Sequence, residues 1–372
     1  MPSLTHNTPA LRFPGYTGVW EQKQLEDVVT VYSGRDYKGI PAGNIPVYGT
    51  GGYMRSISQA LSDNNDAIGI GRKGTIDHPF ILKAPFWTVD TLFYCVPQHD
   101  YDLDFIYGLY QKVPWKALDE STGVPSLSKI AINHIKVLLP SLSEQKQIGF
   151  FFHHLDGLIN LHQRQTQTLK KLKQGLLQDM FPREGESVPR LRFPGFTDTW
   201  EQEEMQDICH YSKTHSEGNR FIGVEDLRQE FAGVNFDKNR RGNGITYQQG
   251  DTLMSNIRPY LKKTWLADCD GVCSSDVLVF SPDTVAPDYL HRIISSEHFV
   301  SSVMSSAKGS KMPRGDKYQM MKMKVMIPSL SEQRKIGSFF RTLDDLIHYH
   351  EQYTVKLTHL KKGLLQKMFP QD

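Results

Sequence analysis

Cysteine is scarce in this sequence, and long apolar runs are missing from it. Four cysteines occur among 372 residues, and only Cys269 and Cys273 stand close together, in an isolated C-x-x-x-C without a second pair at metal-ligand spacing. We therefore expect reduced thiols in preference to a zinc site. No apolar stretch approaches the ~18 residues that a membrane-spanning helix needs, and the first residues lack the apolar core of a secretion signal. These absences predict a cytoplasmic protein without a membrane partner.

The sequence also has little net charge and no recognisable catalytic motif. Its 43 Lys and Arg residues against 41 Asp and Glu leave a net charge of +2. This balance argues against a protein that coats nucleic acid through a broad basic surface, because non-specific affinity grows with the number of phosphates neutralised. Local basic loops remain compatible with it. The chain contains no G-x-S-x-G elbow, H-E-x-x-H pair, P-loop or N-P-P-[YF] tetrapeptide, so we expect no catalytic, cofactor or metal site in it.

Two internal repeats organise the chain. Residues 140–182 return without a gap as residues 328–370, with 26 of 43 positions identical at a constant offset of 188. A shorter lead-in segment, LRFPGYTGVWEQ at 11–22, returns at 191–202 with nine of twelve positions identical. The chain therefore runs as lead-in segment, divergent module and long repeat, twice over. The predicted domains are two modules and two long repeats, at 1–139, 140–182, 183–327 and 328–372.

Each long repeat is predicted to form a helix. Ser141 and Glu144 match the S-x-x-E capping box, in which each side chain accepts a hydrogen bond from an amide of the first turn. Apolar residues then recur at alternating steps of four and three, which is an a/d seam. From Glu144 to Met180 the helix would be roughly 55 Å long at about 1.5 Å per residue. The seam residues are Ile148, Phe152, Leu155 and Ile159 in the first copy, and Ile336, Phe340, Leu343 and Ile347 in the second.

A single long helix cannot bury its own apolar stripe, so the two helices are expected to pair within the chain, with one seam facing the other. Dimerisation through the same seam is the competing interpretation. Both modules are rich in Gly and Pro with short apolar runs such as AIGIG and TLMSNI, which predicts short strands and loops with a few helices, at 103–111 and 288–304. Each module is therefore predicted to be mixed α+β.

The stretch GIGRKG at 69–74 matches G-x-G-x-x-G, but the nucleotide-binding fingerprint needs a helix where TIDHPF follows. A glycine-rich hairpin that presents Arg72 and Lys73 fits better. A guanidinium can contact guanine O6 and N7 together, so Arg72 and Arg258 are candidate base readers. The alternative is a structural ion pair, because Asp90 and Asp276 each follow one of these arginines by eighteen residues.

A basic loop, AKGSKMPRGDK at 307–317, interleaves cations with Gly and Ser and suits contact with phosphates, as do Lys262 and Lys263. A solvated loop without a ligand is the alternative. In the first module STGVP at 121–125 aligns with GSKMP at 309–313, at the same offset of 188 as the helices. The repeat therefore extends upstream of each helix into the module.

Taken together, two divergent modules, each followed by a P-S-L-S-E-Q…I…F-F…L-D…L-I…G-L-L-Q…M-F-P helix and each preceded by LRFPG[YF]T…WEQ, resemble the specificity subunit of type I restriction-modification systems. The segments GIGRKGTI, FWTVDTLFY, GDTLMSNIRPYLKK and CSSDVLVF look like parts of that family's target recognition domains. The resemblance covers essentially the whole chain. It implies an α+β fold in which two mixed α/β target recognition domains are separated by a pair of long antiparallel coiled-coil helices, with pseudo-twofold symmetry.

The resemblance also implies a non-catalytic subunit. Each module would read one half of a bipartite, asymmetric site in double-stranded DNA. Two modification (methyltransferase) subunits would dock on the helical region, and restriction (translocase/nuclease) subunits would join them. S-adenosylmethionine, ATP and Mg are expected on those partners. The other hypotheses are a coiled-coil adaptor that binds only proteins and an enzyme hidden in the modules.

The predicted DNA-binding residues combine the basic loops with the family-like segments. They are Arg72, Lys73, Ser121, Thr122, Lys129, Asn256, Arg258, Lys262, Lys263, Lys308, Ser310, Lys311 and Arg314. The two seams of the long repeats are the residues predicted for helix pairing and partner docking.

Overall fold

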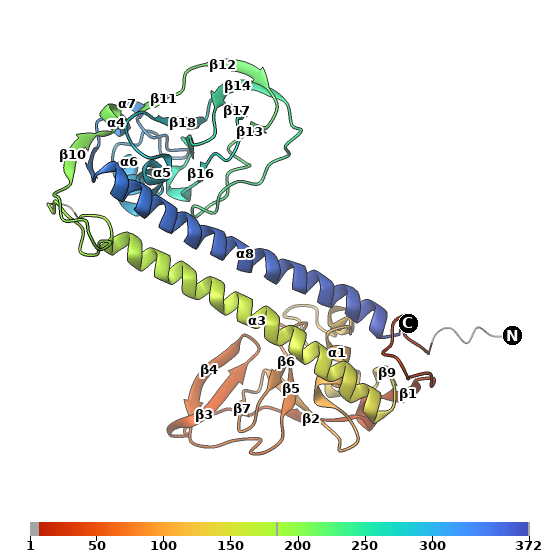
Figure 1. Cartoon of the computed structure of the whole chain (residues 1–372). Helices are drawn as coiled ribbons and strands as arrows, with labels where there is room; N and C mark the ends of the chain where they lie inside the picture. Colours follow the sequence, from red (N-terminus) through yellow and green to blue (C-terminus); the bar gives the residue numbers. More distant parts are fainter. Residues whose placement is uncertain (1–6, 184, 371–372) are drawn as a thin grey trace. The chain divides into compact units, whose positions relative to one another are not determined.

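The structure, a computed structural model, describes residues 7–183 and 185–370. These residues form two compact units. The first unit combines the described residues up to Arg164 with those from Glu351 onward, and the second is Gln165–His350. Each unit holds one divergent module and part of each long helix, α3 (Leu142–Asp179) and α8 (Leu330–Met368) (Figure 1). No helix in the described ranges is long and apolar enough to cross a membrane.

The first module contains two sheets and a separate strand pair. Its four-stranded sheet has the order β2 (Val29–Ser33), β8 (Leu92–Pro97), β5 (Ala67–Gly71), β6 (Phe80–Leu82), and its three-stranded sheet the order β4 (Gly52–Ile57), β3 (Ala42–Gly49), β7 (Trp87–Thr88). The strands β1 (Glu21–Gln24) and β9 (Lys136–Leu139) pair antiparallel. The helical segments are η1 (Leu25–Asp27), α1 (Leu103–Tyr110), η2 (Trp115–Leu118) and α2 (Lys129–Asn133).

The second module repeats this plan with a different second sheet. Its sheets have the orders β11 (Cys209–Tyr211), β18 (Val277–Pro282), β15 (Thr252–Ser255), β16 (Thr264–Leu266), and β12 (His215–Gly218), β14 (Gly242–Tyr247), β17 (Gly271–Cys273), β13 (Phe221–Ile222). The pair β10 (Glu201–Glu204) and β19 (Lys324–Ile327) matches β1 and β9. The helical segments are α4 (Met205–Ile208), η3 (Pro259–Leu261), α5 (Pro287–Ile294), α6 (Glu297–Ser305) and α7 (Lys317–Met321).

The order β2-β8-β5-β6 in the first module therefore corresponds strand for strand to β11-β18-β15-β16 in the second. The fold is α+β, as predicted, and the duplication extends into modules whose sequences have diverged. The helix predicted at 103–111 is α1. The single helix predicted at 288–304 is wrong, because the chain forms α5 and α6 with a break at Ser295 and Ser296. The Ser296 hydroxyl accepts a hydrogen bond from Phe299 N–H at 3.0 Å and so starts a new helix.

The long helices α3 and α8 are antiparallel, and this changes what their seams contact. The seam at the start of α3, which includes Ile148 and Phe152, shares one hydrophobic cluster with the far end of α8, where Leu365 and Phe369 lie. In the second unit the start of α8 packs in the same way against the end of α3, with Phe340 and Met180 in one cluster. The prediction that the two seams face each other is therefore wrong.

Both seams are instead core residues of separate units. Their side chains are all buried, which leaves the other faces of α3 and α8 for any partner. Ion pairs set the antiparallel register inside each unit. Lys361 Nζ lies 2.5 Å from Asp156 Oδ1 in the first unit, and Lys173 Nζ lies 2.5 Å from Asp344 Oδ1 in the second.

The repeated P-S-L-S-E-Q motif joins the start of each long helix to the rest of its unit. The Ser141 hydroxyl accepts a hydrogen bond from Glu144 N–H at 3.4 Å, which is half of the predicted capping box. The other half is replaced, because the Glu144 carboxylate binds the guanidinium of Arg12. Gln145 then donates to the Pro140 carbonyl at 3.0 Å and accepts from Asp102 N–H at 3.2 Å. The motif therefore anchors the lead-in segment and α1 to one helix end.

The second copy makes the same contacts. Ser329 caps Glu332 N–H at 3.4 Å, Arg192 binds the Glu332 carboxylate, and Gln333 bridges the Pro328 carbonyl and Ala286 N–H at 2.9 Å each. A glycine at the same place in each helix permits this packing. A Cβ at Gly149 would lie 2.2 Å from Asp102 Oδ1, and one at Gly337 would lie 2.5 Å from Asp288 Cβ.

Each lead-in segment also lies against the end of the helix that precedes it in cyclic order. Leu191 N–H donates to the carbonyl of Asp179 in α3, and Leu11 N–H donates to the carbonyl of Lys367 in α8, both at 2.8 Å. The buried Trp20 packs edge-to-face on Phe369 at 6.1 Å between ring centroids, and Trp200 packs in the same way on Phe181 at 6.2 Å. Both units therefore repeat the same contact between a lead-in segment and a helix end.

Candidate nucleic-acid interface

The loop after β5 is a glycine-dependent connection between antiparallel strands. No helix follows the GIGRKG stretch; the chain turns through Arg72 and Lys73 and returns as β6. Gly71 has no room for a side chain, because a Cβ there would lie 2.0 Å from the Thr75 carbonyl oxygen. The prediction of a hairpin that presents Arg72 and Lys73 is confirmed, whereas the nucleotide-binding geometry is not formed.

This loop pairs with the segment that leads into α2. Gly74 N–H donates to the Pro125 carbonyl and Leu127 N–H to the Arg72 carbonyl, both at 2.9 Å, and Lys73 forms an isolated β-bridge with Ser126. Because α2 begins at Lys129, these hydrogen bonds bring the three predicted cations Arg72, Lys73 and Lys129 to one place. Residues more than fifty positions apart thus form a single surface.

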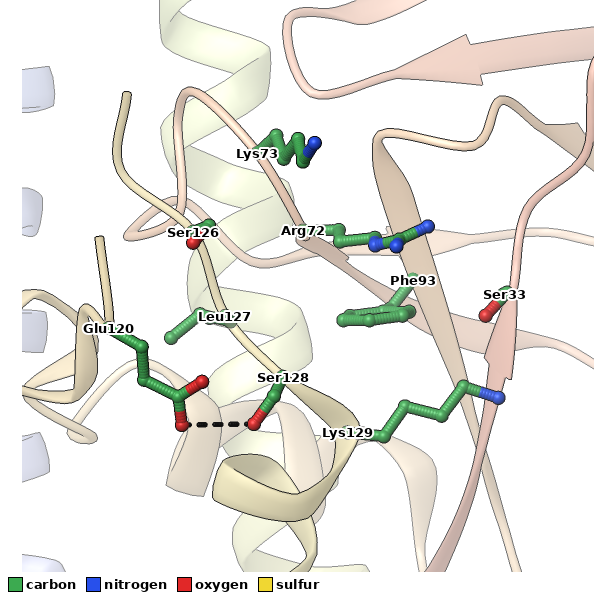
Figure 2. Close-up of a pocket in the computed structure, with 9 residues that line it drawn as sticks. All are labelled: Ser33, Arg72, Lys73, Phe93, Glu120, Ser126, Leu127, Ser128 and Lys129. Atoms are coloured by element: carbon green, nitrogen blue, oxygen red, sulfur yellow. Dashed lines mark hydrogen bonds between the residues drawn. The ribbon is translucent and has the colours of Figure 1, made fainter. Parts of the chain in front are cut away.

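A cavity of about 380 Å³ opens between these segments. Figure 2 shows the side chains of Arg72, Lys73 and Lys129 extending in the same direction, with the Arg72 guanidinium over the ring of Phe93. The Arg72 Cζ atom lies 5.8 Å from the Phe93 ring centroid, and its Nη1 is 3.4 Å from the Asp90 carbonyl oxygen. The lining residues are Ser33, Arg72, Lys73, Phe93, Glu120, Ser126, Leu127, Ser128 and Lys129.

Three basic side chains line the cavity, and none of them forms an ion pair with another residue in the described part of the chain. Glu120 is the one carboxylate among its lining residues, and it accepts a hydrogen bond from the Ser128 hydroxyl at 3.0 Å. Within the described part of the chain, Lys73 and Lys129 have no ion-pair partner and Arg72 contacts no carboxylate. The alternative, an ion pair between Arg72 and Asp90, is therefore not formed. A guanidinium placed over a ring and flanked by two ammonium groups can bind a phosphate or the edge of a base.

The neighbouring loop is held by one carboxylate. Asp119 Oδ1 accepts hydrogen bonds from Ser126 N–H, Ser121 N–H and the Ser121 hydroxyl at 2.9, 3.0 and 2.8 Å. The Ser126 amide and the Ser121 groups lower the pKa of Asp119 because they stabilise its charged form. Of the two predicted contacts in this loop, Ser121 is thus engaged in shaping it, whereas Thr122 is exposed.

In the second module the corresponding residues also converge. Arg258 N–H donates to the Pro313 carbonyl at 2.8 Å, and Ile257 forms an isolated bridge with Arg314. Arg314 and Lys308 exchange two backbone hydrogen bonds of 2.9 Å, so residues 308–314 fold into a tight loop that includes Ser310 and Lys311. The same region of the module is built here by backbone pairing instead of an Asp side chain.

Arg258 adopts the left-handed conformation, with φ of +50°. For a residue other than glycine this costs roughly 1–2 kcal/mol, so the surrounding hydrogen bonds must hold it in place. In the described ranges the side chains of Arg258 and Lys311 have no hydrogen-bond or ion-pair partner, and both are exposed. Asp276 does not pair with Arg258, as the alternative supposed, because Arg314 Nη1 lies 2.7 Å from its carboxylate. Lys308 is paired with Asp316 at 2.8 Å.

Two predicted contacts bond within the second module, and a third is buried. Lys262 Nζ lies 3.0 Å from Glu230 and 2.7 Å from Glu297, and Lys263 Nζ donates to the Val224 carbonyl at 2.8 Å. Asn256 is buried beside Gly315. These contacts weaken the prediction that Lys262 and Lys263 bind DNA, because acidic and carbonyl groups far along the chain already hold the two lysines.

Sequence reasoning missed the ring that supports Arg72. Phe93 lies in the run VDTLFYC, where apolar residues on both faces of β8 hide the one that reaches the site. The lining serines were also missed, although Ser126 aligns with Arg314 at the offset of 188. That alignment was the available signal for them.

A family model described as "Type I restriction modification DNA specificity domain" matches residues 18–171 and 197–359. The chain belongs to this family. The two matches cover one copy each of module and long helix, which agrees with the duplicated fold. The resemblance inferred from the motifs is thereby confirmed, and the chain is a type I specificity-subunit protein.

Two specificity subunits of type I restriction enzymes are similar to this chain over most of their length. The chain is 22% identical over 290 residues to the type I restriction enzyme MjaVIII specificity subunit of Methanocaldococcus jannaschii, covering 71% of this chain and 68% of the relative. It is 23% identical over 319 residues to the type I restriction enzyme EcoDI specificity subunit of Escherichia coli, covering 72% and 69%. A crystal structure of the type I restriction-modification S subunit from M. genitalium has the same fold, with a TM-score of 0.74 at 14% identity over 98% of this chain and 100% of that one.

Proposed function

We propose that this specificity-subunit protein binds double-stranded DNA in a sequence-specific manner, and that each module reads one half of a bipartite, asymmetric target. The observation that carries the proposal is the recurrence of cations at equivalent loops. Arg72, Lys73 and Lys129 surround a cavity in the first module, whereas Arg258 and Lys311 project from the corresponding loop of the second. Because the two sets differ in residues and in supporting contacts, the two half-sites differ in sequence.

The remaining steps belong to partner subunits. The chain itself is proposed to be non-catalytic and to carry no cofactor. Two modification subunits would use S-adenosylmethionine to methylate the target, and restriction subunits would use ATP and Mg. The duplication supports two docking places, since α3 and α8 are two copies of one helical segment at an offset of 188.

A coiled-coil adaptor without DNA specificity is the second candidate. It accounts for the helix pairing, but it gives no reason for exposed, uncommitted cations at matching loops of both modules. An adaptor would bind DNA no more tightly at low salt than at high salt, whereas phosphate contacts make affinity fall steeply as salt rises.

The decisive experiment maps modified bases in cells that express this chain with its cognate modification subunit. The expected wild-type result is one bipartite motif with an unread gap. Replacement of Arg258 and Lys311 together should abolish recognition of one half, while Arg72→Ala with Lys129→Ala should affect the other. If both variants retained the full motif, these residues would not be the readers.

The gap offers a separate test of the helical region. Inserting four residues after Arg164 and four after His350 would extend α3 and α8 together by roughly 6 Å, or about two base pairs. The modified motif should keep both halves and gain about two base pairs of gap. An insertion in α3 alone breaks the pairing register and serves as the control that should lose modification. An unchanged gap in the double insertion would count against a spacing role.

A further inference from the structure

The loops that carry the cations also carry an unexplained apolar side chain. Val124 is 67% exposed and Met312 is 48% exposed. They occupy the same position in the repeat, 188 residues apart, although STGVP and GSKMP share few other residues. A single exposed apolar residue is ordinary in proteins. Recurrence at equivalent positions does not by itself distinguish this pair, because Ile130 and Tyr318 share it. Val124 and Met312 differ from that pair because each lies beside a proline whose carbonyl bonds to an arginine-bearing loop.

The position of these residues ties them to the reading loops. Val124 directly precedes Pro125, whose carbonyl accepts the hydrogen bond from Gly74 next to Lys73, at 2.9 Å. Met312 directly precedes Pro313, whose carbonyl accepts the hydrogen bond from Arg258 N–H, at 2.8 Å. In both modules an apolar side chain is thus one residue away from the segment that presents the candidate base-reading arginine.

The charge around Val124 and Met312 indicates which kind of ligand they contact. Lys73, Arg72 and Lys129 gather at the first site, and Lys311 directly precedes Met312 at the second, so a polyanion is the complementary surface. Within a DNA groove an apolar side chain can make favourable contact with few groups, of which the C5-methyl of thymine in the major groove is the most accessible. Val has too short a side chain to act as a wedge between stacked bases, so the chemistry common to both sites is methyl contact.

We infer that Val124 and Met312 are specificity-determining residues, each of which packs against a thymine methyl group in its own half-site. This rests on the proposed function, since it assumes that the modules read DNA. The arginines would then select a guanine in each half, while Val124 and Met312 favour a T·A pair beside it, so each module reads at least two base pairs by different chemistry.

The test uses the complex of this chain with its cognate modification subunits and a duplex carrying the mapped target. Each thymine is replaced in turn by deoxyuridine, which lacks only the methyl group. In the wild-type complex one such replacement in each half-site should weaken binding roughly fourfold, as expected for one methyl group returned to water. Val124→Ala should remove the effect in one half and Met312→Ala in the other. Their exposure predicts that neither change disturbs folding, which circular dichroism checks.

Two matched controls lie six residues further on. Ile130 and Tyr318 are 67% and 65% exposed, also occupy equivalent positions, and should leave the deoxyuridine effect unchanged when replaced by Ala. The inference is overturned if no deoxyuridine weakens binding, if a half-site contains no T·A pair, if the effect survives in the Val124 and Met312 variants, or if the controls remove it as well. A complex that modifies no defined site would overturn the proposed function and this inference with it.

Discussion

Arg12 and Glu144, 132 residues apart in the sequence, form a doubly hydrogen-bonded ion pair within the first unit. Arg12 Nε donates to Oε1 at 2.8 Å and Nη2 donates to Oε2 at 2.6 Å, and a third bond of 2.6 Å runs from Nη1 to the Gly18 carbonyl. The Glu144 side chain is only 2% exposed. Arg192 and Glu332 repeat this arrangement in the second unit, so it is a duplicated anchor between lead-in segment and long helix.

Arg12→Ala should destabilise the first unit by about 3–5 kcal/mol, because it leaves the Glu144 carboxylate buried without its counter-ion. Arg192→Ala should have a similar effect on the second unit. The measurement is urea denaturation followed by tryptophan fluorescence, to which the buried Trp20 of the first unit and Trp200 of the second contribute. Arg190→Ala is the control, since its pair with Glu186 is exposed and should contribute under about 1 kcal/mol. Equal effects for Arg190 and Arg192 would contradict the anchor.

The Asp344 carboxylate binds two cationic side chains, those of Lys173 and Arg292. It accepts from Lys173 at 2.5 Å and from the buried Arg292 at 2.6 Å, whereas Asp156 pairs with Lys361. Burial lowers the pKa of Lys173, an effect that the charge of Asp344 opposes. Asp344→Asn therefore leaves two cations without a counter-charge and should cost about 3 kcal/mol, against roughly 1–2 kcal/mol for Asp156→Asn. Thermal unfolding of the two variants, compared with the parent, decides whether this ranking holds.

His291 should make the second unit sensitive to mild acid. Full burial holds its pKa well below the usual value, and the nearby charges of Arg292, Lys173 and Arg341 act in the same direction. The folded unit keeps the imidazole neutral, whereas the unfolded chain binds a proton below about pH 6.5. The free energy of unfolding should thus be unaffected above that pH and should fall below it by up to about 1.4 kcal/mol per pH unit.

The variant His291→Gln removes this titration while retaining a polar group near Thr252 and Ser295. Urea denaturation at pH 7.5 and 5.5 should show a loss of stability in the parent that exceeds the loss in the variant by about 1 kcal/mol. Identical pH dependence in the two proteins would mean that His291 is protonated in the folded unit.

Lys262 and Lys311 should behave differently although both are lysines in predicted basic loops. Lys311 is exposed and uncommitted, so Lys311→Ala should reduce the slope of log binding constant against log salt by about one. Lys262 bridges Glu230 and Glu297, so Lys262→Ala should leave that slope unchanged and slightly lower the stability of the second unit. DNA binding measured across a salt series, with both variants side by side, separates the two roles.

Much of the architecture was predictable because repeats and periodic patterns in the sequence indicate it. Local signals predict the duplicated P-S-L-S-E-Q helices, the α+β modules and the hairpin at Arg72. These features depend on interactions between residues that are close in the sequence. Arg72, Lys73 and Lys129 were each identified as candidates. Their assembly into one cavity, however, depends on hydrogen bonds from Gly74 to Pro125 and from Leu127 to Arg72, which no local pattern encodes.

The errors have a common origin in long-range partners. The capping box at Glu144 was half right, because a charge-assisted pair with a distant Arg12 is stronger than a bond to the helix's own neutral amide. Lys262 and Lys263 were assigned to DNA because their partners Glu230, Glu297 and Val224 are distant in sequence. In each case the partner lies far along the chain, where a local pattern does not reveal it.

The sequence by itself determined that this protein is a duplicated pair of modules and long helices, and which face of each helix is apolar, since a period of 3.5 to 3.6 residues defines a buried stripe. Only the tertiary structure decided what that stripe contacts. Periodicity does not specify direction, whereas the ion pairs Lys361–Asp156 and Lys173–Asp344 form only when the helices run antiparallel. That direction brings Ile148 and Phe152 to the end of α8 instead of to Ile336 and Phe340, and so gives each module a core of its own.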